Sequence, residues 1–325
     1  MKAAYIEGFG AEDAFIYGDL PDPVPGLRQV LIRVKATAIN RGDLMRREGT
    51  YGGGTPTTFP FVDGWEVAGV IEAVGSEVKE RHVGQRVVAT LPRGGYAELV
   101  AVNRSGTVPL PNSLSFEEGA SIPIAFLTAW YGLVKVARLE AGETVLIQSG
   151  GSGVGMAGIQ IAKYFGTRVL TTAGSEEKVA KAQALGADLA INYQDRDFLP
   201  EAMRFTGSAG VNVVLESVGG EVLAKSIQAL APMGRLVVVG NSSRSANLPD
   251  LLERLRRRNI TYNSFNLGLQ MSYGGVMAEL AKIMDLCSQG KMKTVVDRVF
   301  PLKEVTEAHR YVAQRRNFGK VVLRP

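Results

Sequence analysis

The sequence predicts a two-domain α/β protein in which a doubly wound parallel sheet is combined with a smaller β domain. From residue 144 onward, short apolar runs of strand character alternate with helical segments. Residues 1–120 instead hold several short strand-like runs separated by glycines and prolines, with few clear helices. The length of 325 residues also favours two domains over one.

The alternating region supplies six expected strands, and helices are expected between them. A series of this kind is typical of a parallel sheet with helices on both faces. The expected strands are "TVLIQ" (144–148), "RVLTT" (168–172), "DLAIN" (188–192), "VNVVLE" (211–216), "RLVVVG" (235–240) and "ITYNSF" (260–265). The expected helices cover about 156–165, 175–185, 197–205, 221–230 and 248–257.

The two ends of the chain predict the second domain. Strand-like runs at 29–39, 66–75, 85–91 and 96–102 indicate a compact antiparallel β domain. The tail adds two helices, at 274–287 and 303–314, and two strands, at 295–300 and 319–325. Because a terminal strand often returns to the first domain, we assign the tail there. The expected domains are therefore 1–120 with 268–325, and 121–267.

Composition limits the function classes. Apolar residues make up 46% of the chain, yet no apolar run approaches the ~20 residues that span a bilayer. The N-terminus lacks the apolar segment of a secretory signal, so a cytoplasmic location is expected. One cysteine, Cys287, and two histidines can hardly supply the ligands of a zinc site. No metal is therefore expected.

A glycine-rich turn, "SGGSGVG" (149–155), joins the first of these strands to its helix. Two versions of the G-x-G-x-x-G pattern overlap there, one starting at Gly153 and one at Gly150. The pattern gives a tight turn, close backbone approach to a pyrophosphate and N–H groups at a helix start. A lone match is weak evidence, but here strand, turn and helix stand in the required order. We expect a dinucleotide to be bound by Ser152, Gly153, Val154 and Gly155.

The end of the second strand, "LTTAGSEEK" (170–178), indicates which dinucleotide is bound. NAD-binding proteins usually place an acid there to hold the ribose 2′-OH, and Gly174 stands near that place here. Without that carboxylate a 2′-phosphate can be admitted, with Ser175 as a hydroxyl donor and Lys178 as the countercharge. Glu176 and Glu177 are acids of a first helical turn, where the helix dipole favours them. The expected cofactor is NADPH.

These pieces together resemble the zinc-free branch of the medium-chain dehydrogenase/reductase superfamily, the quinone oxidoreductase or zeta-crystallin-like family. The resemblance spans nearly the whole chain. It implies a GroES-like catalytic domain, a Rossmann domain and a homodimer joined through the last Rossmann strand, here "ITYNSF". The matching segments are "INRGDLMRREGTY" (39–51), "GWEVAGVIEAVGSEV" (64–78), "GASIPIAFLTAWYGL" (119–133), "VLIQSGGSGVGMAGIQIAK" (145–163), "TAGSEEK" (172–178) and "GKVVLRP" (319–325).

The resemblance also indicates what has been lost. Zinc-dependent relatives have glycine-histidine-glutamate where this chain has Gly64, Trp65 and Glu66, and their first zinc cysteine would lie near Asn40. Trp65 either shapes a pocket or simply packs. Without a Lewis acid to stabilise an alkoxide, hydride transfer to an electron-poor acceptor is favoured over alcohol oxidation. A quinone or an α,β-unsaturated carbonyl fits, because hydrogen bonds can hold the developing oxyanion.

The resemblance implies roles for individual residues. Asn40 and Tyr51 match positions beside the nicotinamide, where they would donate to the acceptor carbonyl or its oxyanion; a turn-capping role for Asn40 and a packing role for Tyr51 are the alternatives. Asp43 and Arg47 are expected to form a structural pair. Matches to cofactor-contacting positions are Thr128, Tyr193, Gly240, Asn241, Phe265 and Asn317.

Two alternatives to quinone reduction stay open. An NADPH-dependent enoyl or alkenal reductase would use the same scaffold on a different acceptor. A nucleic-acid-binding or structural zeta-crystallin-like protein belongs to another class, and the basic stretches at 253–259 and 314–317 are its only support. Neither stretch is interleaved with the aromatic residues on which single-stranded bases usually stack. We therefore expect solvated helix faces there, and a small-molecule partner.

Overall fold

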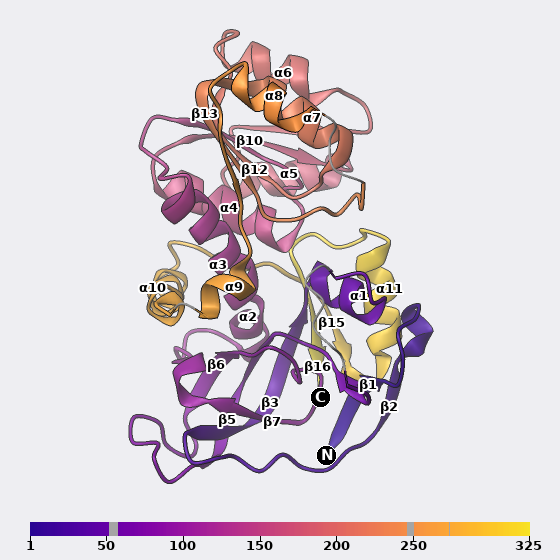
Figure 1. The fold of residues 1–325 in the computed structure, drawn as a ribbon. Coiled ribbons are helices and arrows are strands. Elements are labelled where there is room, and N and C mark those ends of the chain that lie inside the picture. Colours follow the sequence, from indigo (N-terminus) through magenta and orange to yellow (C-terminus); the bar gives the residue numbers. More distant parts are fainter. Residues whose placement is uncertain (52–57, 246–249, 273) are drawn as a thin grey trace. The chain divides into compact units, whose positions relative to one another are not determined.

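The computed structural model describes residues 1–51, 58–245, 250–272 and 274–325, and the chain divides into two compact units. Unit 1 comprises Met1–Ile124 and Met271–Pro325, and unit 2 comprises Ala125–Gln270. The sequence-based boundaries lie after residues 120 and 267. Each unit has its own β-sheet structure and apolar core, so each is described by itself (Figure 1).

Unit 2 is built on a sheet of six parallel strands, counted over the described residues, in the order β11-β10-β9-β12-β13-β14. The strands are β9 (Thr144–Ile147), β10 (Arg168–Ala173), β11 (Leu189–Asn192), β12 (Val211–Glu216), β13 (Leu230–Val238) and β14 (Thr261–Ser264). In chain order this is 3-2-1-4-5-6, so the predicted doubly wound sheet is confirmed. The order reverses beside β9, and the carboxyl ends of β9 and β12 meet there. Ligands of such sheets bind at this edge.

Helices cover both faces of this sheet. Alternation along β9 separates the faces: Leu146 belongs to the core shared with α6, α7 and α8, whereas Ile147 lies against Gly158 of α4. Figure 1 shows α6, α7 and α8 grouped together. The helices of unit 2 are α4 (Gly153–Tyr164), α5 (Glu176–Ala184), α6 (Phe198–Phe205), α7 (Gly220–Ala229) and α8 (Leu251–Arg256), with a π-helical segment at Tyr131–Val136.

Three of these helices begin where a side chain caps the first turn. Ser152 Oγ accepts a hydrogen bond from the backbone N–H of Gly155, and Ser175 Oγ accepts one from Lys178. Asp197 caps α6 in the same manner through Leu199. Serine and aspartate are preferred here because their oxygens satisfy N–H groups that have no partner within the helix. These caps place the N-termini of α4 and α5 at the carboxyl ends of β9 and β10.

In the part of unit 1 that the structure describes there are two sheets. The smaller has the order β2-β1-β4, and the larger the order β15-β16-β3-β5-β6-β8 with β7 also paired to β3. The strands are β1 (Lys2–Ile6), β2 (Ile16–Asp19), β3 (Gln29–Ile39), β4 (Phe61–Val62), β5 (Glu66–Val74), β6 (Arg86–Thr90), β7 (Leu99–Asn103), β8 (Thr107–Pro109), β15 (Val296–Pro301) and β16 (Lys320–Arg324). The antiparallel pattern expected for residues 1–120 is confirmed among β3, β5, β6, β7 and β8, whereas the tail strands β15 and β16 are parallel to each other. The crossover helix α11 between them permits this.

The remaining helices either cover unit 1 or contain its boundary. They are α1 (Arg41–Arg47), α2 (Phe116–Ser121), α3 (Pro123–Trp130), α9 (Leu267–Ser272), α10 (Val276–Ser288) and α11 (Val305–Ala313). The boundary after residue 124 lies inside α3. Helix α2 was not predicted from the sequence, although Ser115 and Glu118 form a capping box at its start. Among the described residues, no helix has the length and apolar character needed to cross a membrane.

Candidate functional site

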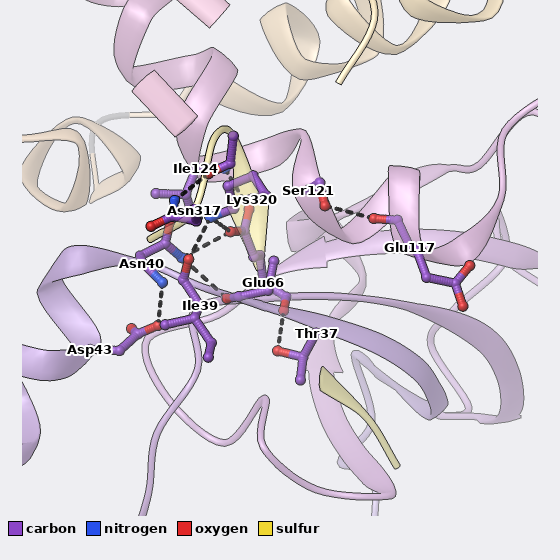
Figure 2. Close-up of polar contacts among 12 residues, drawn as sticks. Thr37, Ile39, Asn40, Asp43, Glu66, Glu117, Ser121, Ile124, Asn317 and Lys320 are labelled. Atoms are coloured by element: carbon purple, nitrogen blue, oxygen red, sulfur yellow. Dashed lines mark hydrogen bonds and ion pairs between the residues drawn. The ribbon is translucent and has the colours of Figure 1, made fainter. Parts of the chain in front are cut away.

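A buried ion pair joins the first residue of β5 to the first residue of β16. Lys320 Nζ lies 2.9 Å from Glu66 Oε1, and the two side chains are 3% and 0% exposed. The same ammonium group donates to the carbonyl oxygen of Ile39 at 2.9 Å and to Asn40 Oδ1 at 2.6 Å. All three of its hydrogens therefore have acceptors. Figure 2 shows these side chains converging at the end of β3.

The Glu66 carboxylate is satisfied on both oxygens. Oε1 accepts from Lys320 and from Asn40 Nδ2 at 2.8 Å, and Oε2 accepts from the backbone N–H of Ile124 at 2.7 Å. A charge that is fully removed from water requires this degree of pairing and hydrogen bonding. Glu66, Lys320 and Asn40, which we call the Lys320 network, therefore tie together β3, β5, β16 and the first turn of α3.

Asn40 has its amide orientation set by this network. Its Oδ1 accepts from Lys320, and its Nδ2 donates to Glu66 and, at 3.4 Å, to the carbonyl of Ala38. Its backbone N–H donates to Asp43 Oδ2 at 2.8 Å, so Asn40 also caps α1. Asn317 lies beside the network in Figure 2, with its Nδ2 donating to the carbonyl of Gly319. The donor role of Asn40 toward an acceptor stays a prediction, since its amide hydrogens point inward here.

Tyr51, the other predicted catalytic residue, packs against Trp65. The ring centroids are 5.3 Å apart with an interplanar angle of 63°, and Tyr51 is 37% exposed. Trp65 immediately precedes Glu66, so Tyr51 lies next to the Lys320 network. The structure thus brings Asn40 and Tyr51 into one region of unit 1, where Asn40 contacts Glu66 and Tyr51 contacts the preceding Trp65.

The expected pair between Asp43 and Arg47 is wrong. Asp43 Oδ2 accepts instead from Tyr96 OH at 2.8 Å, and Arg47 lies 3.1 Å from His309 Nδ1. His309 Nε2 lies 3.2 Å from Tyr96 OH. Burial, and then the charge of Arg47, lower the pKa of His309 well below its usual range. A neutral His309 that accepts from Arg47 and donates to Tyr96 satisfies the whole chain of contacts. The pairing failed because Tyr96 and His309, from distant segments, and the adjacent Glu48, 3.0 Å from Arg47, supplied other partners.

Two carboxyl groups near α1 are buried without full pairing. Asp43 Oδ1 and Asp63 Oδ2 have no hydrogen-bond partner among the described residues. Burial raises the pKa of Asp43 to about 6. Burial and the neighbouring Asp43 charge raise the pKa of Asp63 well above its usual value, although Arg46 lies 3.3 Å away. Both carboxyl groups therefore keep their protons to a higher pH in the folded protein than an exposed aspartate does.

Replacing Asp63 with asparagine should make stability less dependent on pH. Because the folded-state pKa values are raised, the folded state binds more protons than the unfolded state, and stability falls as pH rises through about 4 to 6. Asparagine keeps the Oδ1 acceptor for Gly64 N–H and removes one repelling charge. We expect the stability lost between pH 4.5 and pH 7.5 to shrink by on the order of 1 kcal/mol. Thermal unfolding at a series of pH values measures this loss, and an unchanged slope would contradict the repulsion between Asp43 and Asp63.

The residues around position 65 do not fit a zinc site. Trp65 has no ligand atom, and the Glu66 carboxylate is neutralised by Lys320. Burial raises the pKa of the Cys287 thiol to about 12, whereas a cysteine ligand binds as the thiolate. Over the described residues, no group of three or more histidine, cysteine, aspartate or glutamate side chains is placed to hold a metal ion.

In unit 2 the glycine-rich turn has the geometry that a pyrophosphate requires. Ser152 is the N-cap of α4, and Gly153, Val154 and Gly155 form its first turn. A Cβ on Gly155 would overlap the carbonyl oxygen of Ser149 and lie 2.8 Å from Gly150 Cα, so only glycine fits. The turn therefore stays close to the strand and leaves the helix N-terminus beside the end of β9, where an anion is favoured.

The end of β10 carries a second predicted group of residues. Gly174 lies under Tyr193, since a Cβ there would be 2.6 Å from the Tyr193 hydroxyl. Tyr193 follows β11 and is 43% exposed, which argues against simple core packing. Ser175 caps α5 through the backbone N–H of Lys178. The structure thus gathers Gly174, Ser175, Lys178 and Tyr193 at one place.

The two acids of this segment have partners within unit 2. Glu176 Oε1 accepts from Asn192 Nδ2 at 3.1 Å, and Glu177 Oε1 lies 2.6 Å from Lys181 Nζ. Both acids sit in the first turn of α5, in agreement with the helix-dipole interpretation. Neither takes the place at the end of β10 that a ribose-binding acid would occupy.

The remaining predicted cofactor residues of unit 2 follow later strands, except Thr128, which is buried within α3. Asn241 follows β13 and lies against Gly219 of the loop after β12, and Gly240 lies beside Ser217 of that loop. Phe265 follows β14 and stacks on Tyr131 at 5.7 Å. Gly240, Asn241 and Phe265 are therefore at the carboxyl edge of the sheet, while Asn317 belongs to unit 1.

Sequence reasoning missed a buried polar chain below this edge. Gln148 accepts from Thr172 Oγ1 at 2.7 Å and donates to Ser226 Oγ at 3.0 Å. Ser226 in turn donates to Glu216 Oε2 at 2.8 Å. Glu216 Oε1 accepts from the backbone N–H groups of Val218 and Gly219, so the chain fixes the loop after β12. The available signal was a polar residue closing an otherwise apolar strand, as Glu66 opens one in unit 1.

Two family models match the chain, and they cover parts of both units. One is described as the alcohol dehydrogenase GroES-like domain and matches residues 26–112. The other is described as zinc-binding dehydrogenase and matches residues 185–323. The word zinc in that description belongs to the family model. In this chain the side chains around Trp65 do not fit a zinc ion.

Curated relatives align over nearly the whole chain. Human quinone oxidoreductase is 30% identical over 332 residues, which cover 99% of this chain and 97% of the relative. A phenolphthiocerol/phthiocerol polyketide synthase of Mycobacterium tuberculosis is 34% identical over 319 residues. That alignment covers 98% of this chain but spans only 14% of the length of the polyketide synthase.

Solved structures give the same architecture. An NAD-dependent alcohol dehydrogenase matches with a TM-score of 0.92 and 34% identity, with both chains fully covered. The CurK enoyl reductase matches with a TM-score of 0.90 and 31% identity, covering 99% of this chain and 98% of that one. Escherichia coli quinone oxidoreductase complexed with NADPH matches with a TM-score of 0.93 and 27% identity, again with both chains fully covered. The GroES-like and doubly wound units, the full-length quinone oxidoreductase relative and these structures agree, and the chain belongs to the medium-chain dehydrogenase/reductase family of oxidoreductases.

Proposed function

We propose that this chain is an NADPH-dependent quinone oxidoreductase that works without a metal. The observation that carries the cofactor choice is the group at the end of β10, where Tyr193 lies over Gly174 and Ser175 caps α5 through the backbone N–H of Lys178. A phosphate on the adenosine ribose would find a cation and hydroxyl donors there. An NAD-specific site would instead have a carboxylate at this place, and Glu176 and Glu177 are engaged elsewhere.

Replacing Lys178 with alanine should weaken NADPH binding by about ten- to a hundredfold. A charge-assisted hydrogen bond is worth roughly 1.5–3 kcal/mol, which corresponds to that factor. NADH binding should barely change, because NADH has no 2′-phosphate. The cap of α5 should survive, because Ser175 accepts from the backbone of residue 178 and not from its side chain. Calorimetric titration of both cofactors into both proteins measures the difference.

Lys181→Ala is the matched control for this variant. Lys181 lies on the same helix and is paired with Glu177, so its removal also deletes one positive charge from α5. A loss of NADPH affinity in Lys178→Ala but not in Lys181→Ala supports direct contact with the phosphate. Added salt should weaken NADPH binding more in the parent than in Lys178→Ala, because an exposed ion pair is screened. A parent protein that prefers NADH would show that an acid of α5 holds the ribose.

Residues of unit 1 would orient the acceptor and stabilise the negative charge that develops on its oxygen. Bound NADPH supplies the hydride, and the protein supplies orientation and hydrogen-bond donors. Asn40 is held in one orientation by Lys320 and Glu66, which suits a positioning group. The Tyr51 hydroxyl can donate to the oxygen on which negative charge develops. Thr128 would contact the nicotinamide, as its position in the family implies.

The preference for a quinone over an enoyl or alkenal substrate rests on two supports. The full-length human relative is named a quinone oxidoreductase, and the rings of Tyr51 and Trp65 lie together beside the Lys320 network. The solved relative titled an enoyl reductase favours the second candidate, reduction of an activated carbon–carbon double bond. Steady-state assays with NADPH against quinones, 2-alkenals and enoyl thioesters distinguish them. Turnover confined to the thioesters would overturn the quinone proposal.

Activity should survive extended treatment with a strong chelator. The reason is the donor set: Trp65 stands where zinc-dependent relatives have a histidine, no cysteine lies near Asn40, and the neighbouring Glu66 is ion-paired with Lys320. The chelated and untreated proteins are compared in the same quinone assay, alongside elemental analysis. One tightly bound zinc per chain, together with loss of turnover on chelation, would contradict metal-free catalysis.

We also propose a homodimer formed through β14. This strand is at the edge of the six-stranded sheet, and Thr261–Ser264 are all exposed. An unpaired strand edge can pair with the same edge of a second copy. Light scattering tests the homodimer, and a monomer at tens of micromolar would exclude it.

We do not propose that the chain binds nucleic acid. A cytoplasmic location stays a prediction that cell fractionation would test.

A further inference from the structure

Trp65 is held in a fixed position at the edge of the Lys320 network. The residue is half-buried and immediately precedes Glu66. Its indole ring lies against Gly42 in the first turn of α1: a Cβ on Gly42 would overlap Trp65 Cη2 and lie 2.6 Å from Cζ3. Only glycine at position 42 therefore leaves room for the indole. The ring fills the space between the start of β5 and the helix that Asn40 caps.

The Arg46 side chain also holds the indole. The Arg46 guanidinium lies 5.0 Å from the centre of the Trp65 ring and 4.8 Å from that of Phe61. Arg46 is itself fixed, because NH1 donates to the carbonyl of Pro92 at 2.9 Å and lies 3.3 Å from Asp63. A cation placed over an indole face is attracted by the ring quadrupole. Trp65 therefore has little freedom to leave its position.

Tyr51 meets this fixed ring at an angle of 63°, so the two rings form an aromatic corner. We propose that Trp65, through this corner, makes the acceptor site selective for flat conjugated molecules over open-chain ones. The inference rests on the proposed function, because it takes the region of Asn40 and Tyr51 as the acceptor site. Trp65 is assigned as a specificity-determining residue and has no part in proton or hydride transfer.

The chemistry of the corner favours a quinone ring. Aromatic side chains attract other flat π-systems in offset-stacked or edge-to-face arrangements, beyond the burial of apolar area. A quinone is flat and electron-poor, which complements the electron-rich indole. A straight-chain 2-alkenal presents one short conjugated unit and a flexible tail, so it gains less from the same surface. The difference should appear as a ratio between acceptors and not as a general loss of activity.

The first test is acceptor discrimination in Trp65→Leu and Trp65→Phe. Leucine keeps apolar bulk without a π-face, and phenylalanine keeps a smaller π-face. With NADPH, Trp65→Leu should lower kcat/KM for a naphthoquinone by roughly three- to tenfold relative to that for trans-2-hexenal. Trp65→Phe should restore most of the ratio. An equal loss on both acceptors, or no change in the ratio, would overturn the inference.

The second test does not depend on turnover. The chain has two tryptophans, Trp65 and Trp130, and Trp130 is buried in unit 2 against Phe165. Trp130→Phe therefore leaves Trp65 as the single indole reporter, and Trp65→Phe leaves Trp130 as its control. Titration with the naphthoquinone should quench the first variant saturably and the second only weakly. Equal saturable quenching of both, or none in either, would refute binding at the corner.

The two tests separate this inference from the function on which it rests. If the parent reduces neither acceptor with NADPH, the proposed function fails, and the fluorescence titration alone then decides whether flat conjugated molecules bind beside Trp65. If the parent reduces the quinone but Trp65→Leu does not change the ratio, the function stands and the inference fails. Trp65→Phe and Trp130→Phe keep aromatic packing, so the titration stays informative should Trp65→Leu not fold.

Discussion

Replacing Lys320 with methionine should lower the free energy of unfolding of unit 1 by about 3–5 kcal/mol. The substitution leaves the fully buried Glu66 carboxylate without its cation, and an uncompensated buried charge costs that amount. Asn40 Oδ1 and the carbonyl of Ile39 lose their donor at the same time. The measurement is urea unfolding, combined with hydrogen exchange of the backbone amides in β3, β5 and β16. Protection in these strands should fall, whereas the strands of unit 2 should keep theirs.

Lys163→Met is the control for this experiment. Lys163 pairs with Asp188 at 2.9 Å, but both side chains are 35% exposed. An exposed pair is worth no more than about 1 kcal/mol, because water and salt screen it. The double variant Lys320→Met with Glu66→Gln should recover part of the loss, since it removes the stranded charge. If Lys320→Met and Lys163→Met lower the free energy of unfolding equally, the buried pair is no more important for stability than the exposed pair.

The Lys320 network also shows where sequence reasoning reaches its limit. Glu66 and Lys320 are 254 residues apart, and their contact depends on the pairing of β16 and β5 with opposite edges of β3. No local pattern encodes such a contact, and the lone Glu66 at the start of an apolar strand was its only trace. The expected Asp43–Arg47 pair failed for the same reason, since Tyr96 and His309 come from distant segments.

The doubly wound unit was predictable because each of its signals is local. A buried strand, a capping serine and an amphipathic helix recur within about thirty residues, as at Ser152 and Ser175. For the same reason the sequence predicted both the glycine-rich turn, with Ser152 to Gly155, and the end of β10, with Gly174, Ser175 and Lys178. The parallel pairing of β15 and β16 was not found, because it depends on where the tail returns to the sheet. The polar chain through Glu216 required knowing that β9, β10 and β12 are neighbours.

Replacing Tyr51 with phenylalanine should lower kcat for quinone reduction by roughly ten- to a thousandfold, and should raise KM much less. The range is that of a single lost oxyanion donor, and a fall in kcat with little change in KM marks an interaction made in the transition state. Phenylalanine keeps the ring that packs against Trp65 at 5.3 Å, so the aromatic corner should persist. Steady-state kinetics with NADPH and a naphthoquinone measure both constants, and the fluorescence of Trp65 in the Trp130→Phe background reports whether the acceptor still binds.

Tyr164→Phe is the matched control, because Tyr164 is also exposed and also packs edge-on against an aromatic ring, Phe165, at 5.6 Å. It removes one tyrosine hydroxyl from unit 2, where no acceptor is proposed to bind, so its kcat should equal that of the parent. A drop confined to Tyr51→Phe, with quinone quenching of Trp65 intact, assigns the effect to the hydroxyl and not to acceptor binding. If kcat is unchanged in Tyr51→Phe, protonation comes from water or from the cofactor ribose, and Tyr51 is left with the packing role that its contact with Trp65 already provides.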